Sequence, residues 1–597
     1  TAVGYFALTA NTTGNCNTAV GASAAGEITT GVQNTAVGYN AGGVITTGTK
    51  NVAVGTFALD AANTGQENTA IGHQALTTDT KGQRNVAVGA GSLATQNFTS
   101  ATNSNNTAVG YNAGTALTTA QNNTLIGAFS GDTITTGAQN TLIGSKAACS
   151  LTTAGSNTVI GHNAFSSSTT GGETVAIGDN TMECNTTGCR NVAIGNGTMF
   201  KNTTGVCNTA VGRVALACNT TGNFNSAFGH EALNANTTGC YNTAVGTLAL
   251  SANTTAAYNV AVGFCALDTN TTGAENTSVG TRALFANTTA GNNTAVGFNA
   301  LCDNTTGAQN VAVGWRSLFN NTTGLNNVVI GACASYTSTT AEYSTIVGYK
   351  SSFSTTTGFN NSTLGACTLH DNTTGARNTA VGNSSMQANT TGACNVGVGL
   401  SALRYNTTGT DNTAVGYDSL GDNTAGECNT AVGKKALELL TDADSNTAFG
   451  ARALANATGA NNTAIGHNSG AQGGMINVTS ESNRLVLGNQ DVSNAYVKVA
   501  LTVTSDARDK TNFGTVPHGL DFVNQLEPVS YQFKKSREDD TPHGDLRYGF
   551  KAQDIMALEG DNPVIIDNEF EDALKYKGEH LVPVLVNAIK ELKARIE

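Results

Sequence analysis

"NTAVGTLALSANTTAAYNVAVGFCALDTNTTGAENTSVG" occupies residues 242–280 and contains one phrase three times. Asn, then Thr or Val, then Ala-Val-Gly or Ser-Val-Gly returns every 17 residues, and Asn-Thr-Thr returns between the copies. A helical-hairpin repeat needs about 30 residues or more, so 17 residues suit one coil of a β-solenoid. We therefore expect an all-β fold, a parallel β-roll or β-solenoid.

The repeat glycine carries this period along most of the chain. It starts at Gly4 and keeps a step of 17 to Gly89, where a four-residue insertion follows. The step then runs unbroken from Gly110 to Gly450, and the last step, to Gly466, is 16. This predicts about 28 coils. We divide the chain into a repeat shaft at 1–470, a β connector at 471–504 and a C-terminal domain at 505–597.

Two apolar columns are expected to fill each coil. Thr243 and Val245 share one parity along the strand, while Ala244 has the other. The Val245 position is nearly always apolar, and a leucine such as Leu250 follows the glycine by four residues. We expect the Val and Leu columns inside, and the Ala column as a surface on which another chain packs closely. Because so short a coil encloses a thin core, we expect three chains to form a trimeric fibre.

Composition distinguishes the two ends of the chain and argues against some classes of partner. All five prolines and 30 of the 70 charged residues lie after residue 504, whereas all 13 cysteines lie before it. A net charge of −12 argues against nucleic acid as a partner. No run of 18 apolar residues exists, so we expect no membrane insertion. No cysteine or histidine spacing is typical of a metal site, and no glycine-rich phosphate loop occurs, so we expect no metal and no cofactor.

Two repeated features leave alternatives open. Aromatic residues at turns either pack locally or stack on sugars. The Asn-x-Thr sequons serve either as turns, through the asparagine side chain, or as attachment sites for a column of glycans. The turn aromatics are Tyr5, Tyr39, Tyr111, Trp315, Tyr349 and Tyr417. The sequon asparagines are Asn185, Asn202, Asn219, Asn236, Asn253, Asn270, Asn287, Asn304 and Asn321.

Some copies of the phrase match a known architecture. "TVAIG" at 174–178 and "NVAIG" at 191–195 resemble the head repeats of trimeric autotransporter adhesins, which form a left-handed parallel β-roll with a shorter coil. Similar repeats occur in bacteriophage tail fibres. The resemblance implies a homotrimer exposed outside the cell, either on a virion or, as the alternative, as a bacterial cell-surface adhesin or extracellular fibril.

Several ordered phrases near the C-terminus point to a second family. They are "SDARDK" at 505–510, "GL" at 519–520, "LEPVSY" at 526–531, "YGFKAQDI" at 548–555 and "LVPVLVNAIKELKARIE" at 581–597. Residues 505–597 resemble the intramolecular chaperone domain of phage tailspikes, tail fibres and endosialidases. The resemblance implies a small α+β domain that drives trimerisation and then cuts itself off. It also implies a virion tail fibre or tailspike that attaches to a bacterial surface through a glycan or protein receptor.

In that family a serine and a lysine perform the cleavage, and the matching residues are Ser505 and Lys510. A hydroxyl needs a base to become a nucleophile, and a lysine serves when burial lowers its pKa. Asp506 and Arg508 are expected to order the loop. The scissile bond is Thr504–Ser505 or Ser505–Asp506, and the alternative is a solvated turn with internal ion pairs. Since no paired carboxylates recur in a cleft, we expect autoproteolysis at most and no external substrate.

The last residues carry an apolar stripe with alternating steps of three and four, which is typical of a heptad seam. Such a helix either packs on its own domain or joins two others in a parallel coil. The second alternative would set the register of three repeat shafts, because a slip by one identical coil costs little. The predicted trimerisation residues are Val582, Leu585, Ile589, Leu592 and Ile596.

Overall fold

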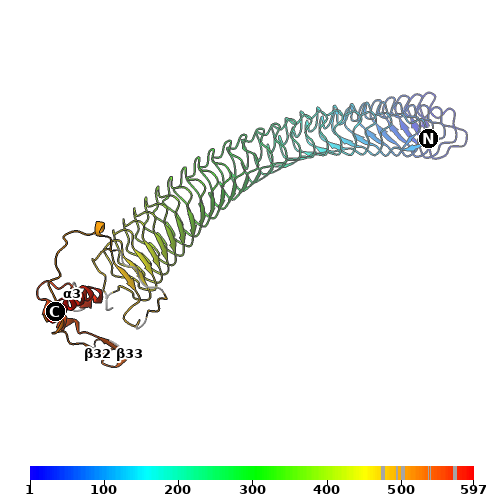
Figure 1. The fold of residues 1–597 in the computed structure, drawn as a ribbon. Helices are drawn as coiled ribbons and strands as arrows, with labels where there is room; N and C mark the ends of the chain where they lie inside the picture. The colour runs from blue at the N-terminus through cyan, green and yellow to red at the C-terminus, as the bar shows by residue number, and fades with distance from the viewer. Residues whose placement is uncertain (472–476, 493–494, 499–504, 535–536, 538, 569–573) are drawn as a thin grey trace. The chain divides into compact units, whose positions relative to one another are not determined.

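The computed structural model describes residues 1–471, 477–492, 495–498, 505–534, 537, 539–568 and 574–597. The chain divides into two compact units, Thr1–Arg377 and Asn378–Glu597. Within each unit, three-residue strands lie side by side from coil to coil (Figure 1).

The first unit contains strands β1 to β24. Their bounds are β1 Ala2–Val3, β2 Thr18–Val20, β3 Thr35–Val37, β4 Val52–Val54, β5 Thr69–Ile71, β6 Gly82–Gln83, β7 Val86–Val88, β8 Thr102–Asn103, β9 Thr107–Val109, β10 Thr124–Ile126, β11 Thr141–Ile143, β12 Thr158–Ile160, β13 Val175–Ile177, β14 Val192–Ile194, β15 Thr209–Val211, β16 Ser226–Phe228, β17 Thr243–Val245, β18 Val260–Val262, β19 Thr277–Val279, β20 Thr294–Val296, β21 Val311–Val313, β22 Val328–Ile330, β23 Thr345–Val347 and β24 Ser362–Leu364. The short β6–β8 pair lies beside the insertion, outside the main ladder.

The second unit continues with strands of the same kind and ends in a different domain. The strands are β25 Thr379–Val381, β26 Val396–Val398, β27 Thr413–Val415, β28 Thr430–Val432, β29 Thr447–Phe449, β30 Thr463–Ile465 and β31 Leu485–Leu487. Strand β31 lies in the expected connector and pairs in parallel with β30. Residues 472–476, 493–494 and 499–504 of that connector, including the expected boundary at 504, lie outside the described residues.

The ladder confirms an all-β parallel solenoid. Within each unit, the strands of the main ladder pair with those one coil away, as Thr243 with Val260 and Ala244 with Ala261. There are about 27 turns, close to the 28 counted from the glycines.

The lining of the coil is the reverse of our expectation for the strand. Ala244 is fully buried, whereas Val245 is 38% exposed. The Leu250 column is buried as expected. Because a coil of 17 residues is narrow, the inward strand position faces the leucine column at close range and has room only for a small side chain. The larger Val or Ile points outward, so the prediction that alanine forms the outer packing surface was wrong.

The turns depend on left-handed backbone at several positions, but the glycine of the Asn-Thr-Thr-Gly turn is not one of them. Gly239 has no positive φ. It is required because a Cβ there would lie 2.3 Å from the carbonyl oxygen of Ala256. Positive φ occurs at the strand-end glycine, with +133° at Gly246, and at Leu248 and Leu250.

The C-terminal domain contains short helices and hairpins around a small core. Its elements are the 3-10 helix η1 Ala507–Asp509, α1 Leu520–Val523, β32 Val529–Lys534, β33 Pro542–Gly549, α2 Ala552–Glu559, β34 Ile566–Asp567, β35 Lys575–Tyr576 and α3 Gly578–Ile596. Strands β32 and β33 form one antiparallel hairpin, and β34 and β35 form another. The core consists of Phe522, Ile555, Ile565, Ile566, Leu581 and Val584. The expected small domain with a terminal helix is confirmed.

Candidate functional site

The loop at 505–510 is ordered by one carboxylate. Asp506 caps the helix η1, because its Oδ1 accepts a hydrogen bond from the backbone N–H of Arg508 at 2.8 Å. The guanidinium of Arg508 returns to the same carboxylate, with Nε 3.1 Å from each oxygen. This pair lowers the pKa of Asp506 below its ordinary value and raises that of Arg508. The two residues are therefore joined by one backbone and several side-chain hydrogen bonds across the turn.

The turn brings the expected serine and lysine together. The Nζ of Lys510 donates a hydrogen bond to the Oγ of Ser505 at 2.6 Å. Both side chains are exposed in the single chain. A general base must lie within this distance of the proton that it removes, so the geometry suits activation of the hydroxyl. The lysine is not buried, and burial is what favours the neutral amine that can accept a proton.

One of the two possible scissile bonds falls partly outside the described residues. Ser505 is described, and Thr504 is not. The structure therefore gives no geometry for the Thr504–Ser505 bond.

Helix α3 has two apolar faces with different surroundings. Leu581, Val584 and Ala588 are 3–4% exposed, and the first two belong to the domain core. The five heptad residues lie on another face and are between 38% and 77% exposed. The alternative of packing on its own domain therefore applies to the first face, and the heptad face is open to solvent in the single chain.

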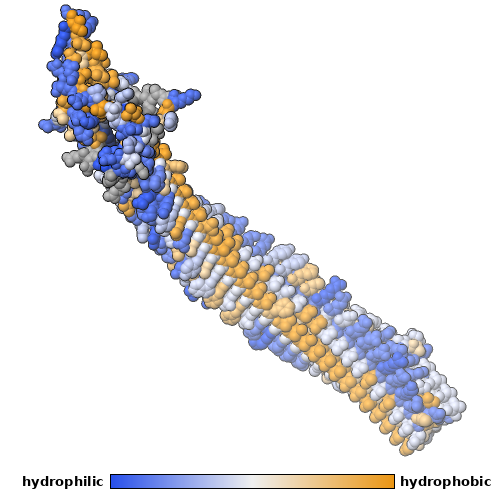
Figure 2. Space-filling model, turned by 90° about the horizontal axis from the view of Figure 1, so that it is seen from below, coloured by the Kyte–Doolittle hydropathy of each residue, from blue (hydrophilic) through white to orange (hydrophobic). Residues whose placement is uncertain are grey.

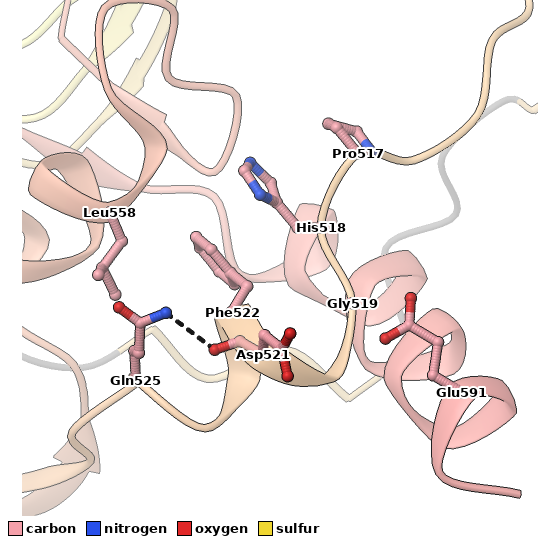
Figure 3. Close-up of a pocket in the computed structure, with 8 residues that line it drawn as sticks. All are labelled: Pro517, His518, Gly519, Asp521, Phe522, Gln525, Leu558 and Glu591. Carbon is pink, nitrogen blue, oxygen red and sulfur yellow. Dashed lines mark hydrogen bonds between the residues drawn. The ribbon is translucent and has the colours of Figure 1, made fainter. Parts of the chain in front are cut away.

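Helix α3 also holds the start of α1 (Figure 3). The Oε2 of Glu591 accepts a hydrogen bond from the backbone N–H of Leu520 at 2.6 Å. The amide of Asn587 donates to the carbonyl of His518 at 3.0 Å. A Cβ at Gly519 would lie 2.1 Å from Glu591 Oε1, which explains the Gly-Leu phrase. The position of α1 thus depends directly on α3.

A small cavity of about 360 Å³ lies beside this contact. The ring of His518 stacks on Phe522 at 4.2 Å, and Gln525 donates to the carbonyl of Asp521 at 3.0 Å, as Figure 3 shows. The polar groups that line it are mostly engaged in holding α1. We assign the cavity to the structure of the domain.

The sequon asparagines are buried inside the coil, which contradicts the glycan interpretation. Asn236 is fully buried, and its Nδ2 donates to Gly239 O at 3.0 Å and to Asn219 Oδ1 at 2.9 Å. This nitrogen is the atom that would carry the sugar, and it has no room for one. The same burial applies to all nine positions: Asn185, Asn202, Asn219, Asn236, Asn253, Asn270, Asn287, Asn304 and Asn321.

A second buried asparagine column was not anticipated. Asn242, just before the strand, donates to Ala256 O at 2.8 Å, and its Oδ1 accepts from the backbone N–H of Asn259 at 3.0 Å. The signal was present in the sequence, because asparagine precedes the Thr-Ala-Val phrase in most coils. The two columns satisfy backbone groups that the turns leave unpaired.

The cysteines, ionisable clusters and helices add no further site. All 13 cysteines are free. Among the described residues, no three His, Cys, Asp or Glu side chains come together as a metal site would require. No described helix combines the length and the apolar character needed to cross a bilayer.

The ordered loop and α1 fall in a segment that matches a family model. Residues 505–563 match the family model for the chaperone of endosialidase. The match includes Ser505 to Lys510 and the α1 region of this chaperone segment, and it ends before α3. Searches of curated proteins and of solved structures found no match. The chain therefore combines a β-solenoid of 17-residue period with a segment that is similar to the chaperone of endosialidase.

Proposed function

We propose that three copies of this chain form the shaft of a bacteriophage tail fibre or tailspike. In this proposal the C-terminal domain aligns the chains and then removes itself. The observation that carries the proposal is the chaperone segment at the end of a long β-solenoid. The family implies trimerisation of fibre proteins.

The exposed heptad face of α3 supports a parallel trimer. Its five apolar side chains would be buried only if other helices covered them. Burial of apolar surface is the main favourable term in association, and a heptad seam places these residues against the same residues of parallel partners. Since every partner would start at the same residue, this contact would set the register of the shafts.

The outer strand face supports the same assembly along the shaft. Val20, Val37 and Val245 are 36–38% exposed, and so are equivalent residues in many coils. Figure 2 shows apolar residues aligned from coil to coil as stripes. A contiguous apolar stripe on a long surface favours contact with another protein, and a second and third copy would present matching stripes.

The Ser505–Lys510 pair supports self-cleavage once the chains assemble. Burial of the lysine on trimerisation would favour its neutral amine, which is the form that can accept a proton. Ser505 Oγ would attack the Thr504 carbonyl carbon, giving its proton to neutral Lys510. The Ser505 nitrogen would leave with that proton, and water would hydrolyse the resulting ester. Attack on its own carbonyl would need a strained four-membered ring, so we favour the Thr504–Ser505 bond.

Cleavage would make assembly irreversible, because the shaft would lose the domain that aligned it. The proposed place of the mature fibre is the virion, where it would contact a bacterial surface glycan or protein receptor. The adhesin-like phrases keep a bacterial cell-surface adhesin or fibril as the second candidate.

The test is expression of 1–597 as wild type and as Ser505→Ala, with mass spectrometry and light scattering. We expect a cut trimer from the wild type and an uncut trimer from the variant. A Thr511→Ala variant is the matched control and should be cut. A monomer in all samples would refute the fibre, and an uncut wild-type trimer would refute the cleavage alone.

A further inference from the structure

Residues of two neighbouring coils form an open groove on the first unit. It has a volume of about 470 Å³ and is lined by Thr340, Glu342, Tyr343, Thr357, Phe359 and Asn360. These residues occupy the turn that precedes strands β23 and β24. The groove therefore lies on the turn surface and is separate from the chaperone segment.

The 17-residue period places two pairs of side chains side by side in the groove, and each pair combines an aromatic with a polar residue. Phe359 lies one coil, or 17 residues, after Glu342, and Asn360 lies one coil after Tyr343. The exposed fractions of Tyr343 and Phe359 are 57% and 39%. Each ring thus has a polar neighbour in its own coil and another in the adjacent coil.

Elsewhere in the Tyr343 column the rings cover one another. Tyr241 is stacked between Phe224 and Tyr258, with centroid distances of 5.0 and 5.1 Å. Tyr343 has Asn326 and Asn360 as its column neighbours, and within the described contacts it takes part in no ring pair. No other ring covers Tyr343, which is 57% exposed, whereas Tyr241 has a ring on each side.

The polar groups of the groove are also available. No described residue forms an ion pair with the Glu342 carboxylate, which is half-buried at the groove wall. The Asn360 amide offers both donors and an acceptor, and Thr340 and Thr357 are exposed beside it. The guanidinium of Arg377 lies over one face of the Phe359 ring, 5.5 Å from its centroid, which leaves the other face and adds N–H donors beside the ring.

We propose that this groove binds a neutral glycan. The C–H faces of a sugar ring would pack on Tyr343 and Phe359, since aromatic rings carry a negative face that attracts polarised C–H groups. Adjacent sugar hydroxyls would donate to the Glu342 carboxylate, a charge-assisted hydrogen bond. The unpaired carboxylate and the net charge of −12 disfavour an acidic glycan. The proposal rests on the proposed function, and names the receptor class for that fibre.

The test measures binding of full-length protein to immobilised dextran, mannan, laminarin and chitohexaose, with polygalacturonate as the acidic probe. We expect at least one neutral probe to bind. Tyr343→Ala, Phe359→Ala and Glu342→Gln should each weaken that binding about tenfold, as expected for loss of a ring contact or a charged acceptor. Tyr241→Ala is the matched control and should bind like the wild type, because it removes a ring outside the groove whose exposed fraction, 49%, lies between those of Tyr343 and Phe359.

Light scattering on the same samples separates this inference from the proposed function. Binding that depends on the groove, in a protein that is not a trimer, supports the groove and refutes the fibre. Trimers that bind none of the neutral probes refute the groove alone. Equal loss in the Tyr241 control, or stronger binding of polygalacturonate, would also overturn it.

Discussion

Lys510 Nζ lies 2.6 Å from Ser505 Oγ within an exposed loop. The contact exists in the single chain, held by the Asp506–Arg508 pair. The side chains that we propose as nucleophile and base therefore meet within one chain, and the proposed reaction still requires desolvation of the lysine. This arrangement would delay cleavage until assembly, since only burial favours the neutral amine.

Lys510→Arg should leave the chain uncut although it keeps the charge. A guanidinium does not lose its proton at accessible pH, so it would not accept one from Ser505. Cleavage should fall by about 100-fold or more, the usual scale for loss of a general base. Intact mass over time measures this, with Lys551→Arg as the control. Cleavage of Lys510→Arg at the wild-type rate would exclude the lysine as base.

Ile589→Asp should prevent trimerisation without unfolding the C-terminal domain. Ile589 is 66% exposed and does not belong to the domain core, but in a heptad seam three buried carboxylates would face one another. We expect a monomer by light scattering with unchanged helical circular dichroism. Lys590→Gln, on an exposed neighbour, should remain trimeric. A trimeric Ile589→Asp protein would show that α3 does not align the chains.

Asn236→Ala should open the coils around it more easily. It removes the donor to Asn219 Oδ1 and one of two donors to Gly239 O, which keeps its hydrogen bond from Asn225 Nδ2. We expect a loss of about 1–3 kcal/mol for the orphaned oxygen of Asn219. Hydrogen exchange of the neighbouring turns measures the local opening energy. Thr238→Ala, at an exposed position of the same turn, should change protection little; equal effects would mean that the asparagine column contributes no special stability.

Asp79 should make the coils beside the insertion sensitive to pH. Burial raises its pKa, although Gln96 Nε2 donates to it at 2.6 Å. Because the folded-state pKa lies above the unfolded one, the stabilising contribution is complete below about pH 4 and is lost as pH rises through the folded-state value.

Asp79→Asn removes that ionisation, and asparagine occupies the equivalent position at Asn236. Its thermal midpoint relative to the wild type should therefore increase between pH 4 and pH 7. Glu27→Gln, at an exposed position, should show no such trend. A constant difference between Asp79→Asn and wild type across this range would contradict the prediction.

The chain's period was enough to predict its solenoid. A strict step of 17 leaves room for one short coil, and glycine at each strand end marks a backbone that other residues rarely adopt. Sequence spacing also predicted two local features. One is the turn that joins Ser505 and Lys510, five residues apart, and the other is the apolar stripe of the last helix, with its steps of three and four. Local geometry depends on neighbours in the chain, so sequence spacing reports it well.

Side-chain direction and distant contacts needed the folded chain. Alternation along a strand separates Ala244 from Val245 but does not say which faces inward; the width of the closed coil decides that. The sequons look the same whether Asn236 is buried or exposed. The Glu591–Leu520 contact joins residues 71 positions apart, and the groove at Tyr343 exists only because stacking places the next coil beside it. Such features depend on which surfaces meet once the coil has closed and packed on its neighbours. Short-range sequence patterns do not contain that information.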